Sequence, residues 1–289
     1  MREAKFGPAG NASSFPGKSS VEAPAWLRSM GLDAYEYQSG KGVNVGQGTA
    51  VRLGEEASRH NIALSLHAPY FINLANPDPA RLEQTIGYII AACRAADWMG
   101  AGRVIVHTGA LMKRSREEAL SIAQGSMVQV LRACDEAGFG HISLCPETMG
   151  KINQLGTLEE VLALCQLDER LIPCVDFGHL YARSLGEAQG EAATEYILDR
   201  ILNRVGEERA RAFHIHFSKI EFTQKGGEVR HLTFDQPEFG PDFTPLGRAL
   251  ARRGWGPIVI CESAGTQAED AVAMQTVYQG LLSGGTERA

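Results

Sequence analysis

Eight short runs of strand-forming residues alternate with longer helical patterns along the chain, and this alternation constrains the fold more than any other feature. Such a repeat is typical of a parallel sheet covered by helices. Eight units within 289 residues predict a (β/α)8 barrel forming a single domain over residues 1–289. The expected strands are residues 4–7, 32–37, 62–67, 103–107, 141–146, 171–176, 211–216 and 257–262. The expected helices are residues 21–30, 47–60, 79–99, 115–137, 157–166, 190–205, 242–253 and 267–283.

A doubly wound open sheet is the alternative architecture. Its dinucleotide-binding form carries a GxGxxG motif after a strand, and the sequence has no such motif there. One connection, residues 217–241, is longer than ordinary loops and indicates function or mobility. The barrel therefore remains the preferred prediction.

Composition places few limits on the partners of the protein. The chain has 28 basic and 34 acidic side chains, which argues only weakly against binding to nucleic acid. Its six cysteines show no CxxC spacing and several lie in apolar runs, so we expect reduced core residues. No segment reaches the roughly 18 consecutive apolar residues that a membrane span requires. We expect a soluble, cytoplasmic protein with no membrane contact.

Histidines and carboxylates stand at the ends of the expected strands. In a (β/α)8 barrel these ends converge on one face, so side chains distant in sequence can share a site there. A mixture of imidazoles and carboxylates without thiolates suits Zn²⁺ or Mn²⁺, and eight ligands exceed what one tetrahedral ion needs. The candidates are His67, His107, Glu147, Asp176, His179, His214 and Glu262, with His231 from the long connection.

Taken singly, each of these residues has an ordinary structural explanation. A strand-end histidine is more often hydrogen-bonded within the protein than bound to metal, and an aspartate there more often caps the following helix. The joint placement of eight such residues favours a site. His60 and His141 are expected to be structural, and His216 is ambiguous because it shares a strand face with His214.

The motifs around these residues resemble the endonuclease IV family of apurinic/apyrimidinic (AP) endonucleases, which are metal-dependent (β/α)8 barrels. They follow the family's order through most of the chain. The matching segments are HAPYFINLA (67–75), VIVHTGA (104–110), PETMGKINQLGT (146–157), CVDFGHLYA (174–182), HIHFSK (214–219), RH (230–231) and CES (261–263).

The resemblance implies hydrolysis of damaged double-stranded DNA at abasic sites with two or three zinc ions. It does not imply a protein partner. Clustered divalent ions lower the pKa of water and stabilise charge on the leaving oxygen. By resemblance, His67, His107 and Glu147 hold a first ion. Asp176, His214 and Glu262 hold a second ion, and the catalytic Glu147 bridges the first and second ions. His179 and His231 hold a third ion.

Other residues are candidates for contact with DNA. Tyr70 falls where the family has an aromatic residue near bound DNA, Lys219 follows His214 in the HIHFSK segment, and Arg230 adjoins His231. Lys113, Arg114 and Arg116 form a further basic cluster, for which an ordinary solvated loop is an equal alternative.

The sequence departs from the family at two motifs. The family has Asp-Arg-His where this chain has Val229-Arg230-His231, and His-x-Asn-Asp-x-Lys becomes HIHFSK. The third ion site thus lacks one carboxylate. Unless Glu228 or Asp235 substitutes for it, Val229→Asp is expected to increase both occupancy of the third site and DNA cleavage.

Two other functions remain open. The related sugar isomerases and epimerases hold a single Mn²⁺ or Mg²⁺, for which Glu147, Asp176, His214 and Glu262 would suffice. The remaining histidines favour the nuclease, because a one-ion isomerase has no evident use for them. A protein that binds DNA lesions without cleaving them is the non-enzymatic alternative.

Overall fold

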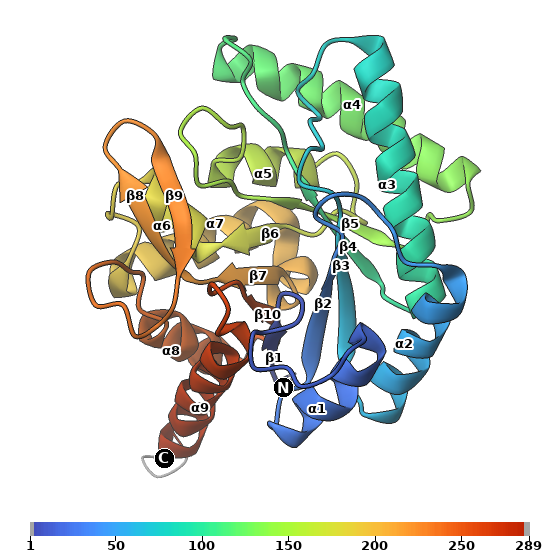
Figure 1. Ribbon diagram of the computed structural model, residues 1–289. Coiled ribbons are helices and arrows are strands. Elements are labelled where there is room, and N and C mark those ends of the chain that lie inside the picture. Colours follow the sequence, from blue (N-terminus) through green and yellow to red (C-terminus); the bar gives the residue numbers. More distant parts are fainter. Residues whose placement is uncertain (1–2, 286–289) are drawn as a thin grey trace.

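Eight parallel strands form the centre of the computed structural model, which describes residues 3–285 (Figure 1). Their order in the sheet is β1-β10-β7-β6-β5-β4-β3-β2. The ends of this sheet meet, because Ala9 pairs with Glu36 in a parallel bridge and Asp33 N donates to Phe6 O at 3.0 Å. The predicted (β/α)8 barrel is confirmed. The strands are β1 (Lys5–Pro8), β2 (Ala34–Gln38), β3 (Ala63–His67), β4 (Arg103–His107), β5 (Ser143–Glu147), β6 (Cys174–Asp176), β7 (His214–Phe217) and β10 (Ile258–Cys261).

Helices surround the barrel (Figure 1). Several begin where the sequence supplies a capping residue: Ser115 and Thr157 each form a capping box with the glutamate three residues later. The long helices are α2 (Gln47–Arg59), α3 (Pro79–Met99), α4 (Arg116–Glu136), α7 (Gly190–Arg211) and α9 (Gln267–Gly285). The shorter ones are η1 (Ser20–Glu22), α1 (Ala23–Ser29), α5 (Leu158–Cys165), α6 (Phe177–Arg183) and α8 (Thr244–Arg253).

Three expected boundaries differ from the structure for local reasons. Strand β6 begins at Cys174 rather than residue 171, since Pro173 has no N–H to give to a ladder. Helix α7 extends to Arg211 across a kink at Gly206, whose φ of 80° is not helical. The seventh strand therefore begins at His214 rather than residue 211.

The long connection after β7 contains a β-hairpin that the sequence pattern did not reveal. Strands β8 (Lys219–Thr223) and β9 (Gly227–Leu232) pair antiparallel and stand beside α6 (Figure 1). Gly178 allows this approach, because a Cβ there would lie 2.5 Å from Ser218 O. The hairpin brings β9 to the carboxyl end of the barrel.

Buried apolar side chains fill the space between the sheet and its helices. All six cysteines are buried and carry free thiols, which confirms the expectation of core residues. Within residues 3–285, no helix combines the length and apolar character that crossing a membrane demands.

The segment after β5, residues 148–156, is held against the barrel by contacts with two partly buried arginines. Arg183 donates through Nε to Met149 O at 2.7 Å and through a terminal nitrogen to Lys151 O and Gln154 O, both at 2.7 Å. Arg116 donates to Ile152 O and Gln154 O and pairs with Glu160 at 2.7 Å. These contacts fix a segment that lines the site described below.

We expect Arg183→Ala to lower the free energy of unfolding by about 1–3 kcal/mol, because three carbonyls lose a charged donor. Urea unfolding followed by circular dichroism measures this change. Arg132→Ala is the control, since Arg132 forms an exposed pair with Glu136 within α4 and such pairs contribute about 0–1 kcal/mol. Equal loss in the two variants would contradict the anchoring role of Arg183.

Candidate metal centre

A cavity of about 460 Å³ opens at the carboxyl ends of the strands. The parallel register brings together residues that lie at the ends of different strands, as in the pairing of His107 with Glu147. Six of the expected ligands line this cavity: His67, His107, Glu147, His179, His231 and Glu262. Asp176 lies beneath them and is fully buried.

The first group consists of His67, His107 and Glu147. Both imidazoles direct Nε2 to Glu147 Oε2 at 3.3 Å. Their Nδ1 atoms lie 2.7 Å from Ala68 O and 3.0 Å from Tyr70 O, so each Nδ1–H donates to a carbonyl. This hydrogen bond fixes the tautomer that leaves Nε2 free to bind an ion.

The second group consists of Glu147, Asp176, His216 and Glu262, whose ligand atoms lie within 4.8 Å of one another. His216 Nδ1 is 2.9 Å from Glu147 Oε1 and 3.5 Å from Glu262 Oε1. The sequence analysis expected His214 in this group, whereas in the structure the ligand atoms of His214 lie near those of Cys174 and His216. His214 instead directs Nε2 to Glu36 Oε2 at 3.0 Å.

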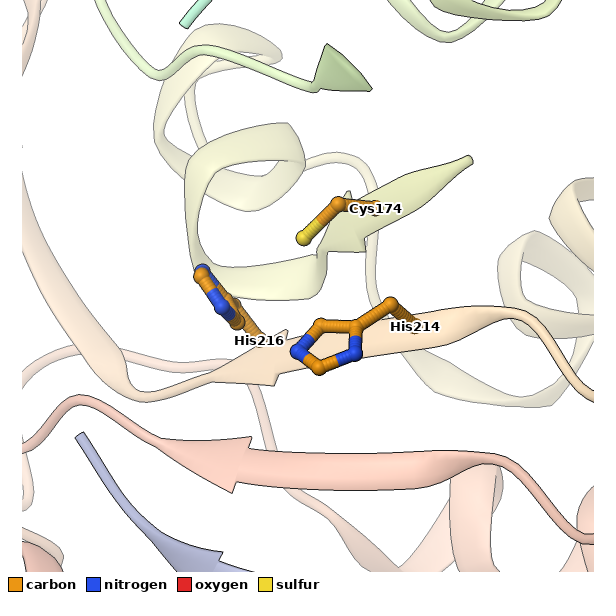
Figure 2. A group of neighbouring side chains, drawn as sticks. All are labelled: Cys174, His214 and His216. Carbon is orange, nitrogen blue, oxygen red and sulfur yellow. The ribbon is translucent and has the colours of Figure 1, made fainter. Parts of the chain in front are cut away.

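Strand register explains the exchange of the two histidines. Residues 214 and 216 point to the same face of β7, but in the pairing with β6 His216 is level with Asp176 and His214 with Cys174. His214 is therefore one side-chain layer deeper in the barrel. Figure 2 shows His214 and His216 projecting from the same strand, with Cys174 opposite them on β6.

The third group consists of His179, Glu228 and His231. His179 Nδ1 donates to Thr148 O at 2.8 Å, and its Nε2 is 3.5 Å from Glu228 Oε2. His231 Nδ1 forms a hydrogen bond with Ser218 Oγ at 2.8 Å. Glu228 thus lies where the sequence comparison found a carboxylate missing.

A β-bulge brings Glu228 into phase with His231. Arg230 pairs with Glu221 while Glu228 pairs with the next residue, Phe222, so Val229 has no partner across the hairpin. The extra residue shifts the alternation by one and puts Glu228 on the face of His231. Gly150 leaves room for it, because a Cβ there would lie 2.6 Å from Glu228 Oε2 and 2.9 Å from the His179 ring. The sequence signal for this substitution is a glutamate three residues before the histidine.

The electrostatics of the site favour bound cations. Burial alone would lower the pKa of His179, yet Asp176, Glu228, Glu147 and Glu262 raise it to about 9. Burial raises the pKa of Glu262, which lies close to other carboxylates. The oxygen Asp176 Oδ2 is buried and has no hydrogen bond within residues 3–285. A cation would neutralise this excess of negative charge and satisfy that oxygen, so the donor set fits divalent metal ions.

His214 differs electrostatically from the surrounding ligands. Burial outweighs the attraction of Glu36 and lowers the pKa of His214 to about 4, so the ring is neutral near pH 7. Burial alone would lower the pKa of His216, yet Cys174, Glu262, Glu36 and Glu147 together raise it well above its ordinary value. The pKa values of His214 and His216, the two histidines of β7, are therefore shifted in opposite directions.

The three residues expected to contact substrate lie in different surroundings. Tyr70 lines the cavity, is 51% exposed and stacks on His107 with ring centroids 5.6 Å apart. Lys219 instead donates to Phe234 O and Gln236 O and lines a neighbouring cavity of about 540 Å³. Arg230 is exposed on the hairpin and pairs with Glu221 at 2.7 Å. Of the three, only Tyr70 is part of the cavity wall.

The remaining basic and histidine candidates also separate. Arg116 is committed to Glu160 and to loop carbonyls, whereas Lys113 and Arg114 belong to the turn before α4. His60 lies near Glu56 at 3.6 Å and His141 near Asp97 at 3.0 Å, which agrees with structural roles.

Sequence comparison identifies relatives of two kinds. A sequence model of the family described as "Xylose isomerase-like TIM barrel" matches residues 24–277. An uncharacterized protein of Methanocaldococcus jannaschii is 33% identical over 88% of this chain and 90% of its own length. A probable endonuclease 4 of Acholeplasma laidlawii is 29% identical over 54% of this chain and 53% of its own. These matches confirm the resemblance to endonuclease IV proteins.

Solved structures show the same fold with different activities in their titles. A D-tagatose 3-epimerase-like protein superimposes with a TM-score of 0.73 at 19% identity, covering 98% of this chain and 99% of that one. Endonuclease IV from Thermus thermophilus gives a TM-score of 0.67 at 20% identity, covering 97% of this chain and 99% of that one. At these identities the likeness establishes the barrel and leaves the reaction open.

Proposed function

Because the chain belongs to the xylose isomerase-like TIM barrel family, we propose that it is a zinc-dependent phosphodiesterase of endonuclease IV type that hydrolyses DNA at abasic sites. The observation that carries this proposal is the convergence of three ligand groups at one cavity, with Glu147 shared by two of them. A reaction that needs one ion would leave His67, His107, His179 and His231 without a purpose. The free thiols of all six cysteines agree with action in the reducing cytoplasm.

We assign His67, His107 and Glu147 to a first ion, Glu147, Asp176, His216 and Glu262 to a second, and His179, Glu228 and His231 to a third. Bound divalent ions would supply a hydroxide nucleophile near pH 7 and stabilise charge on phosphoryl oxygens. Glu147 would lie between the first two ions and supply negative charge to both. Tyr70 would stack on an unpaired base or sugar beside the lesion, since its exposed ring stands at the cavity mouth.

The second candidate is a one-ion sugar epimerase. It is favoured by a single observation, that Glu147, Asp176, His216 and Glu262 form a complete ligand set by themselves. In that case a carboxylate of the cavity would move the proton of a ketose. Metal content and substrate turnover separate the two candidates.

We expect protein purified without chelator to contain at least two zinc ions per chain, measured by elemental analysis. The same preparation is expected to cleave a duplex with one abasic site and to leave ketoses unchanged. Cleavage of an undamaged duplex of the same sequence is the control for contaminating nucleases. One ion per chain together with ketose turnover would establish the epimerase, and tight lesion binding without cleavage would establish the binding protein.

A further inference from the structure

Glu36 is a fully buried carboxylate beneath the metal centre that belongs to none of the three ligand groups. Its Oε2 accepts hydrogen bonds from Ser65 Oγ at 2.8 Å and His214 Nε2 at 3.0 Å. Its Oε1 accepts from Gln38 Nε2 at 3.1 Å and lies 3.0 Å from His216 Nε2. A buried carboxylate is costly unless such partners surround it, so its position in the middle of β2 calls for an explanation.

The orientation of His216 provides that explanation. Its Nδ1 faces Glu147 and Glu262 in the second ligand group, and its Nε2 faces Glu36. An imidazole binds an ion through the nitrogen that carries no proton, so the proton of a His216 bound through Nδ1 resides on Nε2. A buried N–H needs an acceptor, and Glu36 Oε1 is the carboxylate oxygen beside it.

His216 presents a different ring nitrogen to its ligand group than three other candidate histidines do. His67, His107 and His179 each give Nδ1–H to a backbone carbonyl and direct Nε2 to the ligand groups. His216 directs Nδ1 there, and the contact of its Nε2 with Glu36 does not reach hydrogen-bond geometry in the structure. The tautomer of this histidine therefore depends on a side chain rather than on the backbone.

His214 holds Glu36 in place from below. Its Nε2–H donates to Glu36, whereas its Nδ1 is buried and has no hydrogen-bond partner in the described part of the chain. Ser65 supplies the second donor to the same oxygen. His214, which the sequence analysis named as a ligand, thus helps to hold Glu36, and Glu36 in turn contacts the candidate ligand His216.

We propose that Glu36 is a positioning residue of the metal centre, which keeps the proton of His216 on Nε2 and presents Nδ1 to the ion shared with Glu147, Asp176 and Glu262. The inference rests on the proposed metal centre but not on its reaction, because a nuclease and an epimerase would need the same histidine. Carboxylates that orient ligating histidines typically change metal affinity by about 10–100-fold when removed.

The first test compares Glu36→Gln with the parent in a zinc titration against a chromophoric chelator. The amide keeps the shape of the side chain, but it accepts on one side only and so cannot serve both His214 and His216. We expect about 10–100-fold weaker binding of one ion. The matched control is Asp33→Asn, the same change at a carboxylate that binds Phe6 N before β2, at the opposite end of the barrel. We expect this control to bind zinc as the parent does.

The second test needs no variant and remains decisive if Glu36→Gln fails to fold. In the zinc-loaded parent, ¹⁵N chemical shifts of the histidines are expected to show His216 protonated on Nε2 and bound through Nδ1. Binding through Nε2 of His216, or zinc bound to His214, would overturn the inference. So would unchanged zinc affinity in Glu36→Gln. A parent that binds no ion would overturn the proposed metal centre itself, and the role of Glu36 with it.

Discussion

Glu147→Gln is expected to lower the rate of abasic-site cleavage by more than about 100-fold, beyond the usual effect of residues that only orient ligands. Glu147 is the one side chain common to the first two ligand groups. Its Oε2 lies 3.3 Å from both His67 and His107, and its Oε1 lies 2.9 Å from His216. Glutamine keeps the shape but removes the charge, so two cations would repel each other across the site.

Single-turnover cleavage of an abasic duplex, with zinc content measured on the same sample, checks this prediction. Glu159→Gln is the control, because Glu159 on α5 carries the same charge in a half-exposed pair with Arg200 on α7. We expect the control to cleave at the parent rate. A Glu147→Gln variant that retains both its zinc and its activity would show that the two ions do not share this carboxylate.

Glu228→Gln is expected to remove the third ion, whereas Val229→Asp is expected to add little. The bulge at Val229 turns Glu228 toward His179 and His231, and Val229 itself is 47% exposed. With only two imidazoles left, the third position loses its charged oxygen ligand, and its zinc affinity is expected to fall by at least about 10-fold. Cleavage is expected to fall with it, since that cation would help neutralise the phosphate under attack.

Zinc titrations of the parent and both variants, with cleavage rates at matched zinc concentrations, test this pair of predictions. Glu221→Gln is the control on the same hairpin, because Glu221 pairs with exposed Arg230 and belongs to none of the ligand groups. If Val229→Asp raised the occupancy of the third site and Glu228→Gln left it unchanged, the valine would be the defect that the sequence comparison suggested.

The sequence alone determined the architecture and the position of the site. Strand and helix patterns depend on local spacing, and the ends of parallel strands in a closed barrel must meet on one face. Residues such as His67, His107 and Glu262 could therefore be assigned to that face before their contacts were known. Helix α6 and the β8–β9 hairpin escaped prediction, because they are short elements stabilised mainly by packing against the barrel end.

Only the tertiary structure decided which atoms meet within the site. Alternation along β7 places His214 and His216 on one face, but their depth follows from the register with β6, which sequence does not encode locally. The choice of Glu228 over Val229 follows from a bulge, which is set by the pairing of two strands. Glu36 remained unnoticed because a lone glutamate within a strand carries no signal until its partners, 29 and 178 residues away, are brought beside it.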